Sequence, residues 1–287
     1  MERELHESKD NKWIPMTSVL SGIGQEITED VYYYTNQIVN VIFIGKPQDK
    51  TWYLVDAGMP GSAEKIISVA NERFGKGSKP VAILLTHGHF DHVGGLVDLV
   101  KQWEVPIYAH ELEFPYLTGE QSYPEPDGSV EGGLLAKISP IYPHEPINVA
   151  PFLKVLPQDH TIPGLSEWEW IHTPGHSPGQ VSFFRKRDSL LIAADAFVTV
   201  KQDSFYKVLL QDPEVHGPPR YLTTDWQAAK ASVIALEKLK PKTAITGHGP
   251  ALDGTQLTEG LSKLVQDFEE MAVPDYGKFV DGDHFTH

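Results

Sequence analysis

Four side chains that can bind a metal ion lie within six consecutive residues, His87-Gly88-His89-Phe90-Asp91-His92. The apolar run from Val81 to Thr86 precedes them, and it is long enough for a buried strand but too short for a helix. A helix is predicted to begin near Val93. A strand-to-helix turn lets several side chains converge at the edge of a sheet, and Gly88 permits backbone geometry that a bulkier residue resists. The segment therefore predicts a polar cluster at the end of a buried strand.

Helix capping offers a simpler explanation for part of this pattern, because Asp is a good N-cap. Capping accounts poorly for three histidines and an aspartate at this spacing, since so many polar groups at a sheet edge are costly without partners. Imidazole and carboxylate groups suit zinc, iron and manganese, so the residue types alone do not name the metal. The turn is interpreted as a metal site.

Three more candidate ligands follow later in the chain. His176 lies in a turn stiffened by Pro174 and Pro178, Asp195 follows the apolar run 190–194, and His248 follows a short run that ends at Thr246. Each signal is weak alone. Strands are also predicted at 31–44, 51–55, 168–172, 181–184 and 243–246, and helices at 62–74, 224–239 and 257–271.

In this order the residues resemble the signature of the metallo-β-lactamase-fold superfamily, from about Val31 to Gly249. The resemblance implies an α+β fold, a four-layer αββα sandwich of two mixed β-sheets with the site at one edge. We therefore expect a single domain over residues 1–287. An insertion of loops and short helices is expected at about 113–163, where prolines and glycines are frequent.

The resemblance also implies seven metal ligands and two divalent metal ions, zinc first, with manganese, iron or cobalt as alternatives. The ligands of the first ion are His87, His89 and His176, those of the second are Asp91, His92 and His248, and Asp195 bridges the two. Asp56 matches an acidic position that orients a ligand histidine. Asp91 is the candidate catalytic residue, relaying a proton to the leaving group.

The resemblance predicts hydrolysis of a small ester, lactone or thioester by a metal-bridging hydroxide. The chain has no cysteine, which excludes a cysteine nucleophile and a disulfide framework. Two alternatives stay open: a phosphodiesterase, and a mononuclear iron-dependent sulfur (persulfide) dioxygenase that uses His87, His176 and Asp195. Lactonase-like and glyoxalase II-like relatives fit best. However, Val198 stands where homoserine-lactone lactonases have a tyrosine, which disfavours that substrate.

The formal net charge of −15 disfavours nucleic acids and anionic membranes as partners. We expect a small-molecule substrate and a cytoplasmic protein, and a homodimer is left open. Candidate walls of an apolar pocket are Phe114, Tyr116, Tyr123, Phe197, Phe205, Tyr206 and Tyr221, although packing of these aromatics onto the core explains each equally well. His172 is either beside the site or a packed strand-end residue. His110 is a weaker pocket candidate, and the histidines expected on the surface or in loops are His6, His144, His160, His216, His284 and His287.

Overall fold

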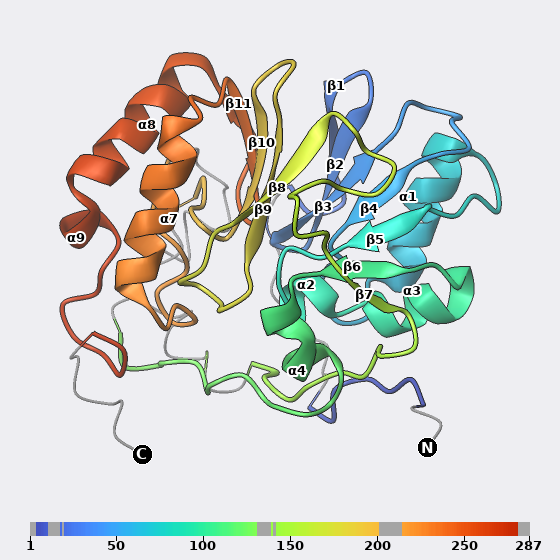
Figure 1. Ribbon diagram of the computed structural model, residues 1–287, viewed down its shortest axis with the longest axis horizontal. Coiled ribbons are helices and arrows are strands. Elements are labelled where there is room, and N and C mark those ends of the chain that lie inside the picture. Colours follow the sequence, from blue (N-terminus) through green and yellow to red (C-terminus); the bar gives the residue numbers. More distant parts are fainter. Residues whose placement is uncertain are drawn as a thin grey trace. The chain divides into compact units, whose positions relative to one another are not determined.

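The computed structural model describes residues 4–10, 18, 20–130, 139, 142–200 and 214–280. The chain divides into two compact units. Unit 1 is Met1–Pro124 with Pro143–Leu156, and unit 2 is Glu125–Tyr142 with Pro157–His287. Each unit contains one mixed β-sheet with its own helices (Figure 1). In the described part of the chain, no helix has the length and apolar character needed to cross a membrane.

The sheet of unit 1 has seven strands that follow one another in sequence order. Pairing is antiparallel from β1 to β4 and parallel from β4 to β7. Parallel neighbours need crossover connections, and each of the three connections between β4 and β7 contains at least one helix. The strands are β1 (Gly24–Thr28), β2 (Val31–Asn36), β3 (Val39–Ile44), β4 (Tyr53–Val55), β5 (Ala82–Leu84), β6 (Ile107–Ala109) and β7 (Leu153–Val155). The helices are α1 (Ala63–Phe74), α2 (Phe90–Val93), α3 (Leu96–Trp103), the 3-10 helix η1 (Glu111–Glu113) and α4 (Phe114–Leu117).

The core of unit 1 lies between this sheet and helices α1 and α3 (Figure 1). All six residues of β3 are buried, which suits its nearly continuous apolar sequence. Trp52 stacks on Phe74 of α1 with ring centroids 4.4 Å apart, and it meets Trp103 of α3 edge to face at 5.7 Å. This packing joins the ends of both helices to the start of β4.

The sheet of unit 2 has five strands in the order β12-β11-β10-β9-β8. Only the β10–β11 pair is parallel among these strands, and α7 forms its crossover. Helices α7 and α8 cover one face of the sheet (Figure 1). The strands are β8 (Trp168–His172), β9 (Val181–Arg185), β10 (Leu190–Ala194), β11 (Thr243–Thr246) and β12 (Leu252–Asp253). The helices are α7 (Trp226–Lys238), α8 (Gly254–Gln266) and α9 (Phe268–Met271).

Most predicted elements are confirmed, and two helices differ in detail. The helix predicted to begin near Val93 is divided into α2 and α3 at Gly94 and Gly95. A Cβ atom on Gly94 would lie 2.2 Å from the backbone nitrogen of Pro60, so the glycine is required by this close approach. The last helix begins at Gly254, earlier than predicted, and α8 ends before Asp267.

The described part of segment 113–163 contains loops, the short helix α4 and strand β7. Its residues are shared between the two units, since unit 2 takes Glu125–Tyr142 and unit 1 takes Pro143–Leu156. Its apolar residues Leu134, Leu135, Ile138 and Ile141 lie outside the described residues.

Candidate metal centre

Asp56, which follows β4, anchors the segment that carries the candidate ligands of unit 1. The Asp56 carboxylate accepts hydrogen bonds from the backbone N–H of Thr86, the hydroxyl of Thr86 and Nδ1 of His92, each at 2.8 Å. Asp56 is buried and has a φ of 61°, a left-handed conformation that is strained for a non-glycine residue. Asp56 therefore contacts a candidate ligand histidine, and its hydrogen bonds to Thr86 also hold the end of the strand that leads into the turn.

These contacts fix which nitrogen of each ring is available. His92 donates Nδ1–H to Asp56, so in the neutral ring its Nε2 carries the lone pair. The Thr86 hydroxyl gives its proton to Asp56, so its oxygen accepts from Nδ1 of His87 at 3.0 Å. The His87 ring centroid lies 4.2 Å from that of His92 and 4.7 Å from that of His89. Unit 1 therefore brings three imidazoles together.

Asp91 completes this cluster in the first turn of α2. Its Oδ2 lies 4.0 Å from Nε2 of His92, and both side chains are buried. A carboxylate facing the lone-pair nitrogen of an imidazole is repulsive unless a cation lies nearby. The donor set of unit 1 thus fits a bound cation.

Gly88 is explained by close approach and not by an unusual backbone angle, since its φ is not positive. Its N–H donates to Oε2 of Glu113 at 2.8 Å and to the hydroxyl oxygen of Tyr123 at 3.0 Å. A Cβ atom on Gly88 would lie 2.7 Å from that hydroxyl. Burial raises the pKa of the Tyr123 phenol well above its ordinary value, and the Glu113 carboxylate raises it further. The hydroxyl therefore stays protonated and donates to Glu113.

In unit 2 three candidate ligands come from three separate turns. Oδ2 of Asp195, just after β10, lies 3.4 Å from Nε2 of His176 and 3.3 Å from Nε2 of His248. Asp195 follows Ala194, whose φ is 52°, and the β10–β11 register shifts there. The strained strand end turns the carboxylate toward both histidines.

Thr223 fixes the tautomer of His176. The Thr223 hydroxyl donates to the carbonyl oxygen of Pro219 at 2.8 Å, so its oxygen accepts from Nδ1 of His176 at 3.1 Å. Nε2 of His176 then faces the Asp195 oxygen either as a protonated imidazolium or with its lone pair directed at a shared cation. The chemistry of this donor set fits a divalent metal ion, since both histidines and the carboxylate are buried.

Thr86, Thr223, Glu113 and the role of Tyr123 toward Gly88 were not predicted from the sequence. Thr86 carries a signal, because it directly precedes His87 at the end of a strand. Thr223 carries none, because it is far from His176 in sequence and belongs to no motif.

The remaining histidines lie in other surroundings. His172 donates Nε2–H to the carbonyl oxygen of Pro178 at 2.9 Å, as expected for a packed strand-end residue. Nδ1 of His110 accepts from the backbone N–H of Leu112, so this ring caps η1. His160 packs on Trp170, and His216 pairs with Glu214. His284 and His287 lie outside the described residues.

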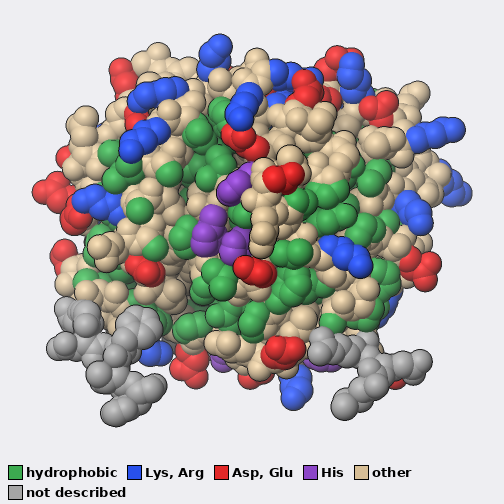
Figure 2. All heavy atoms as spheres, in the orientation of Figure 1, with side chains coloured by type: hydrophobic (Ala, Val, Ile, Leu, Met, Phe, Trp, Pro, Cys, Tyr) green, Lys and Arg blue, Asp and Glu red, His purple; other side chains and the backbone are tan. Residues whose placement is uncertain are grey.

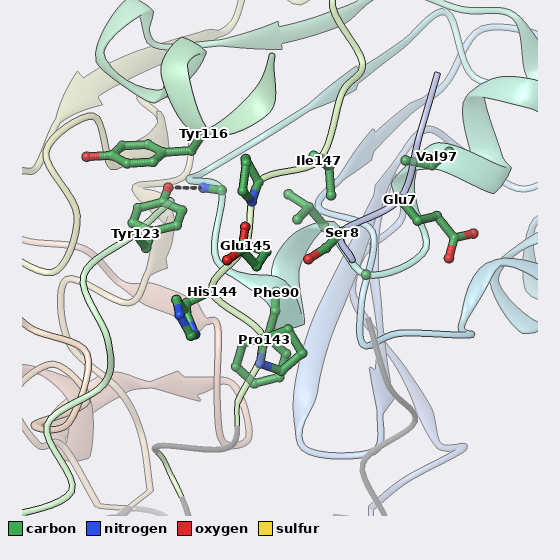
Figure 3. Close-up of a pocket in the computed structure, with 14 residues that line it drawn as sticks. Glu7, Ser8, Phe90, Val97, Tyr116, Tyr123, Pro143, His144, Glu145 and Ile147 are labelled. Carbon is green, nitrogen blue, oxygen red and sulfur yellow. Dashed lines mark hydrogen bonds between the residues drawn. The ribbon is translucent and has the colours of Figure 1, made fainter. Parts of the chain in front are cut away.

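A cavity in unit 1 lies behind the metal-binding turn (Figure 3). Gly88 and Phe90 line it, whereas the alternating residues His87, His89 and Asp91 do not. Tyr116 and Tyr123 form one wall, as the sequence suggested, and their rings stack at 3.8 Å.

The other aromatics predicted as pocket walls mostly pack in the interior. Phe197 is fully buried in the core of unit 2, Phe114 packs against the core of unit 1, and Tyr221 meets Tyr142 edge to face. Phe205 and Tyr206 lie outside the described residues.

Charged groups are distributed without strong segregation on the face shown in Figure 2, where basic side chains alternate with acidic ones around the rim. With the net charge of −15, this surface does not favour a polyanionic partner.

Known proteins resemble this chain over most of its length. Residues 34–248 match the family model described as the metallo-beta-lactamase superfamily. The probable metallo-hydrolase YflN of Bacillus subtilis (strain 168) is 44% identical over 253 residues, which cover 88% of this chain and 96% of that protein. A hydroxyacylglutathione hydrolase of Xylella fastidiosa (strain 9a5c) is 49% identical over 51 residues, which cover 17% of this chain and 18% of that protein.

Solved structures give the same result. The protein TTHA1623, crystallised in a di-iron-bound form, has a TM-score of 0.50 and 26% identity, and the match covers 75% of this chain and 89% of that one. A metallo-beta-lactamase of Cronobacter sakazakii has a TM-score of 0.60 and 18% identity, covering 88% and 95% of the two chains, and it shows the fold alone.

The chain therefore belongs to the metallo-β-lactamase superfamily, and it is an enzyme of the metal-dependent hydrolase class. The predicted fold class is confirmed: an α+β protein with two mixed sheets and the fold of this superfamily. The matched residues 34–248 also agree with the predicted extent of the resemblance.

Proposed function

We propose that the chain hydrolyses a small ester, lactone or thioester, and that its seven candidate ligands together hold two divalent metal ions. The observation that carries the proposal is the fixed tautomer of three ligand histidines. His87, His92 and His176 each direct Nδ1–H at an acceptor, which leaves Nε2 for a metal. Membership of the superfamily supports the joint site, and the di-iron form of TTHA1623 supports a pair of ions.

Divalent ions held by these residues would supply Lewis acidity and would lower the pKa of a bound water towards neutrality. The residues of the chain hold and orient the site. Asp195 presents one carboxylate oxygen to His176 and His248, which suits a bridging ligand. Asp91, at the first turn of α2, is the residue that we propose to accept a proton and pass it to the leaving group. Zinc is the metal expected first, and iron, manganese and cobalt suit the same ligands.

The net charge and the relatives support the proposed substrate class. Because the net charge is −15, a small neutral or weakly charged substrate is favoured over a polyanion. The match to a hydroxyacylglutathione hydrolase supports a thioester among the candidates. A phosphodiester or a persulfide remains an alternative substrate, and the test below includes both.

The test combines metal analysis with a substrate panel. The purified protein is assayed with aryl esters, simple lactones, thioesters, phosphodiesters and glutathione persulfide, and its metal content is measured. We expect two equivalents of metal and turnover of an ester, lactone or thioester. Turnover confined to phosphodiesters, or oxygen consumption with the persulfide and one equivalent of iron, would overturn the proposed reaction.

Matched histidine variants separate the site from general stability. We expect His87→Ala and His176→Ala to lose metal and activity together, because each removes a ligand imidazole. His160→Ala is the control. The His160 ring packs on Trp170, and its Nδ1 hydrogen-bonds to the carbonyl oxygen of Trp170, which is not a candidate ligand. His160→Ala should keep its metal. Equal metal loss in all three variants would contradict the ligand assignment.

A further inference from the structure

Glu113 is a fully buried carboxylate at the same sheet edge as the metal-binding turn. Strands β5 and β6 are parallel neighbours, with Leu84 paired to Tyr108, so their carboxyl ends lead to one edge. The chain after β5 reaches Gly88 there, and the chain after β6 reaches Glu113 in η1. A buried charge is costly without hydrogen bonds, so the contacts of Glu113 identify what it stabilises.

Oε2 of Glu113 binds the turn. This oxygen accepts from the N–H of Gly88 at 2.8 Å and from the hydroxyl of Tyr123. The same Gly88 N–H also reaches the Tyr123 oxygen at 3.0 Å, the bond drawn in Figure 3. Three hydrogen bonds among Gly88, Glu113 and Tyr123 therefore hold the backbone between the candidate ligands His87 and His89.

Tyr123 extends this contact to a ligand side chain. Its ring centroid lies 4.4 Å from that of His89. The Tyr123 ring also stacks on Tyr116 of α4, with ring centroids 3.8 Å apart (Figure 3). The backbone N–H of Tyr123 donates to the carbonyl oxygen of His144, which fixes the loop. One residue therefore contacts both the Gly88 peptide and the His89 ring.

We infer that Glu113 and Tyr123 are positioning residues for the metal ligands, Glu113 by fixing the Gly88 peptide and Tyr123 by fixing the His89 ring. The inference rests on the proposed metal site. Neither residue contacts the reacting groups in this account. Hydrogen bonds that orient metal ligands typically change metal affinity by about 10- to 100-fold when they are removed.

Cobalt binding tests the inference with a readout that does not depend on activity. The dissociation constant for Co²⁺ and the visible spectrum of the Co²⁺-loaded protein are measured for wild type, Glu113→Ala, Glu113→Gln and Tyr123→Phe. All are measured well below the melting temperature of the metal-free variants. We expect Glu113→Ala to weaken Co²⁺ binding about tenfold or more and to change the spectrum.

Glu113→Gln is the conservative rescue, because its amide oxygen can occupy the place of Oε2 and accept both hydrogen bonds. We expect its affinity to lie within about threefold of wild type. Tyr123→Phe keeps the ring beside His89 and loses only the hydroxyl, so we expect an effect smaller than that of Glu113→Ala.

Thr35→Val is the control for a loss of stability alone. Thr35 is buried in the same unit and donates its hydroxyl to Oδ1 of Asn40 at 2.9 Å, on strands β2 and β3. It should lower the melting temperature without changing Co²⁺ affinity. Wild-type affinity and spectrum in Glu113→Ala would overturn the positioning role alone. No Co²⁺ binding by the wild type would overturn the proposed metal site, and the positioning role with it.

Discussion

The two ligand clusters are built in different ways. In unit 1 all four candidate ligands come from one turn, and a single carboxylate, Asp56, anchors that turn through three hydrogen bonds. In unit 2 each ligand comes from a different turn, and His176 and His248 meet at Asp195, itself a candidate ligand. Unit 1 is therefore preorganised by residues outside the ligand set, whereas unit 2 depends more on its own ligands. We therefore expect the two clusters to tolerate different substitutions.

Glycine substitutions give the largest expected difference. Gly175, beside His176, has a φ of 129°, and a Cβ atom there would lie 2.3 Å from the backbone nitrogen of Ala229 in α7. Because backbone cannot move aside easily, we expect Gly175→Ala to lower the free energy of unfolding by roughly 4 kcal/mol. In unit 1 the atom nearest to a Cβ on Gly88 belongs to the Tyr123 side chain. We expect Gly88→Ala to cost about 2 kcal/mol, measured by denaturant unfolding of the metal-free protein.

The rescue of Gly88→Ala sharpens this comparison. In a Tyr123→Phe background the hydroxyl is absent, so we expect the cost of Gly88→Ala to fall below about 1 kcal/mol. The same cost in both backgrounds would show that the Tyr123 hydroxyl is not what excludes a side chain at Gly88. Gly175→Ala has no such side-chain partner to remove.

The residues that orient the candidate ligand histidines should also differ between the two units. We expect their substitution to lower the free energy of unfolding more in unit 1 than in unit 2, by less than the glycine substitution Gly175→Ala. Asp56→Ala removes the acceptor of three buried donors, and we expect a loss of roughly 3 kcal/mol in the free energy of unfolding. Thr223→Val removes the acceptor of one donor, Nδ1 of His176, and we expect a loss of about 1 kcal/mol. Chemical denaturation of both variants without metal provides the comparison. Equal losses would contradict the view that unit 1 is the more strongly preorganised.

In each unit the carboxylate of one aspartate, Asp10 or Asp127, accepts backbone hydrogen bonds from a segment distant in sequence. We expect substitutions of these two aspartates to have the smallest effects. Asp10 is partly buried, which alone would raise its pKa, but hydrogen bonds from Ser8 and from the backbone N–H groups of His144 and Glu145 lower the pKa overall. For a carboxyl group with a lowered pKa, the stabilisation is present above the ordinary value near 3.9 and is lost as the pH falls through the folded-state pKa. NMR titration of the His144 amide signal should therefore show a midpoint below about 3.9. A midpoint at or above that value would contradict the contact.

Asp127 is the counterpart in unit 2. Partial burial again opposes the shift, while hydrogen bonds from Ser129 and from the backbone N–H of Lys278 lower its pKa. Amide hydrogen exchange at neutral pH should be faster at His144 in Asp10→Asn and at Lys278 in Asp127→Asn, each variant affecting its own unit only. Faster exchange at both amides in either variant would show that the Asp10 and Asp127 contacts are coupled.

The same contrast explains what could be read from the sequence. The cluster of unit 1 is contiguous, so spacing alone singled out its four candidate ligands, whereas Asp56 was assigned through the resemblance to the family. The ligands of unit 2 are separated by long intervals, and they were assigned only through the order of the family signature.

Contacts set by packing were not predictable. Thr223 reaches His176 only because the loop after Pro219 folds beside it, and no local pattern records that contact. The aromatic side chain of Phe197 would suit a pocket wall, but it packs in the core of unit 2. Its burial depends on neighbours that are distant in sequence. The reason for Gly88 was misassigned for the same cause: the constraint is the Tyr123 hydroxyl, which lies in another loop.

The metal content of Asp195→Asn tests the central claim most directly, because this residue belongs to unit 2 and is proposed to serve both ions. An amide bridges two cations poorly, so we expect the wild type to hold two equivalents of divalent metal and the variant to retain less than one. The account predicts that a change in unit 2 also removes metal from the ligands of unit 1. Two full equivalents in correctly folded Asp195→Asn would contradict it.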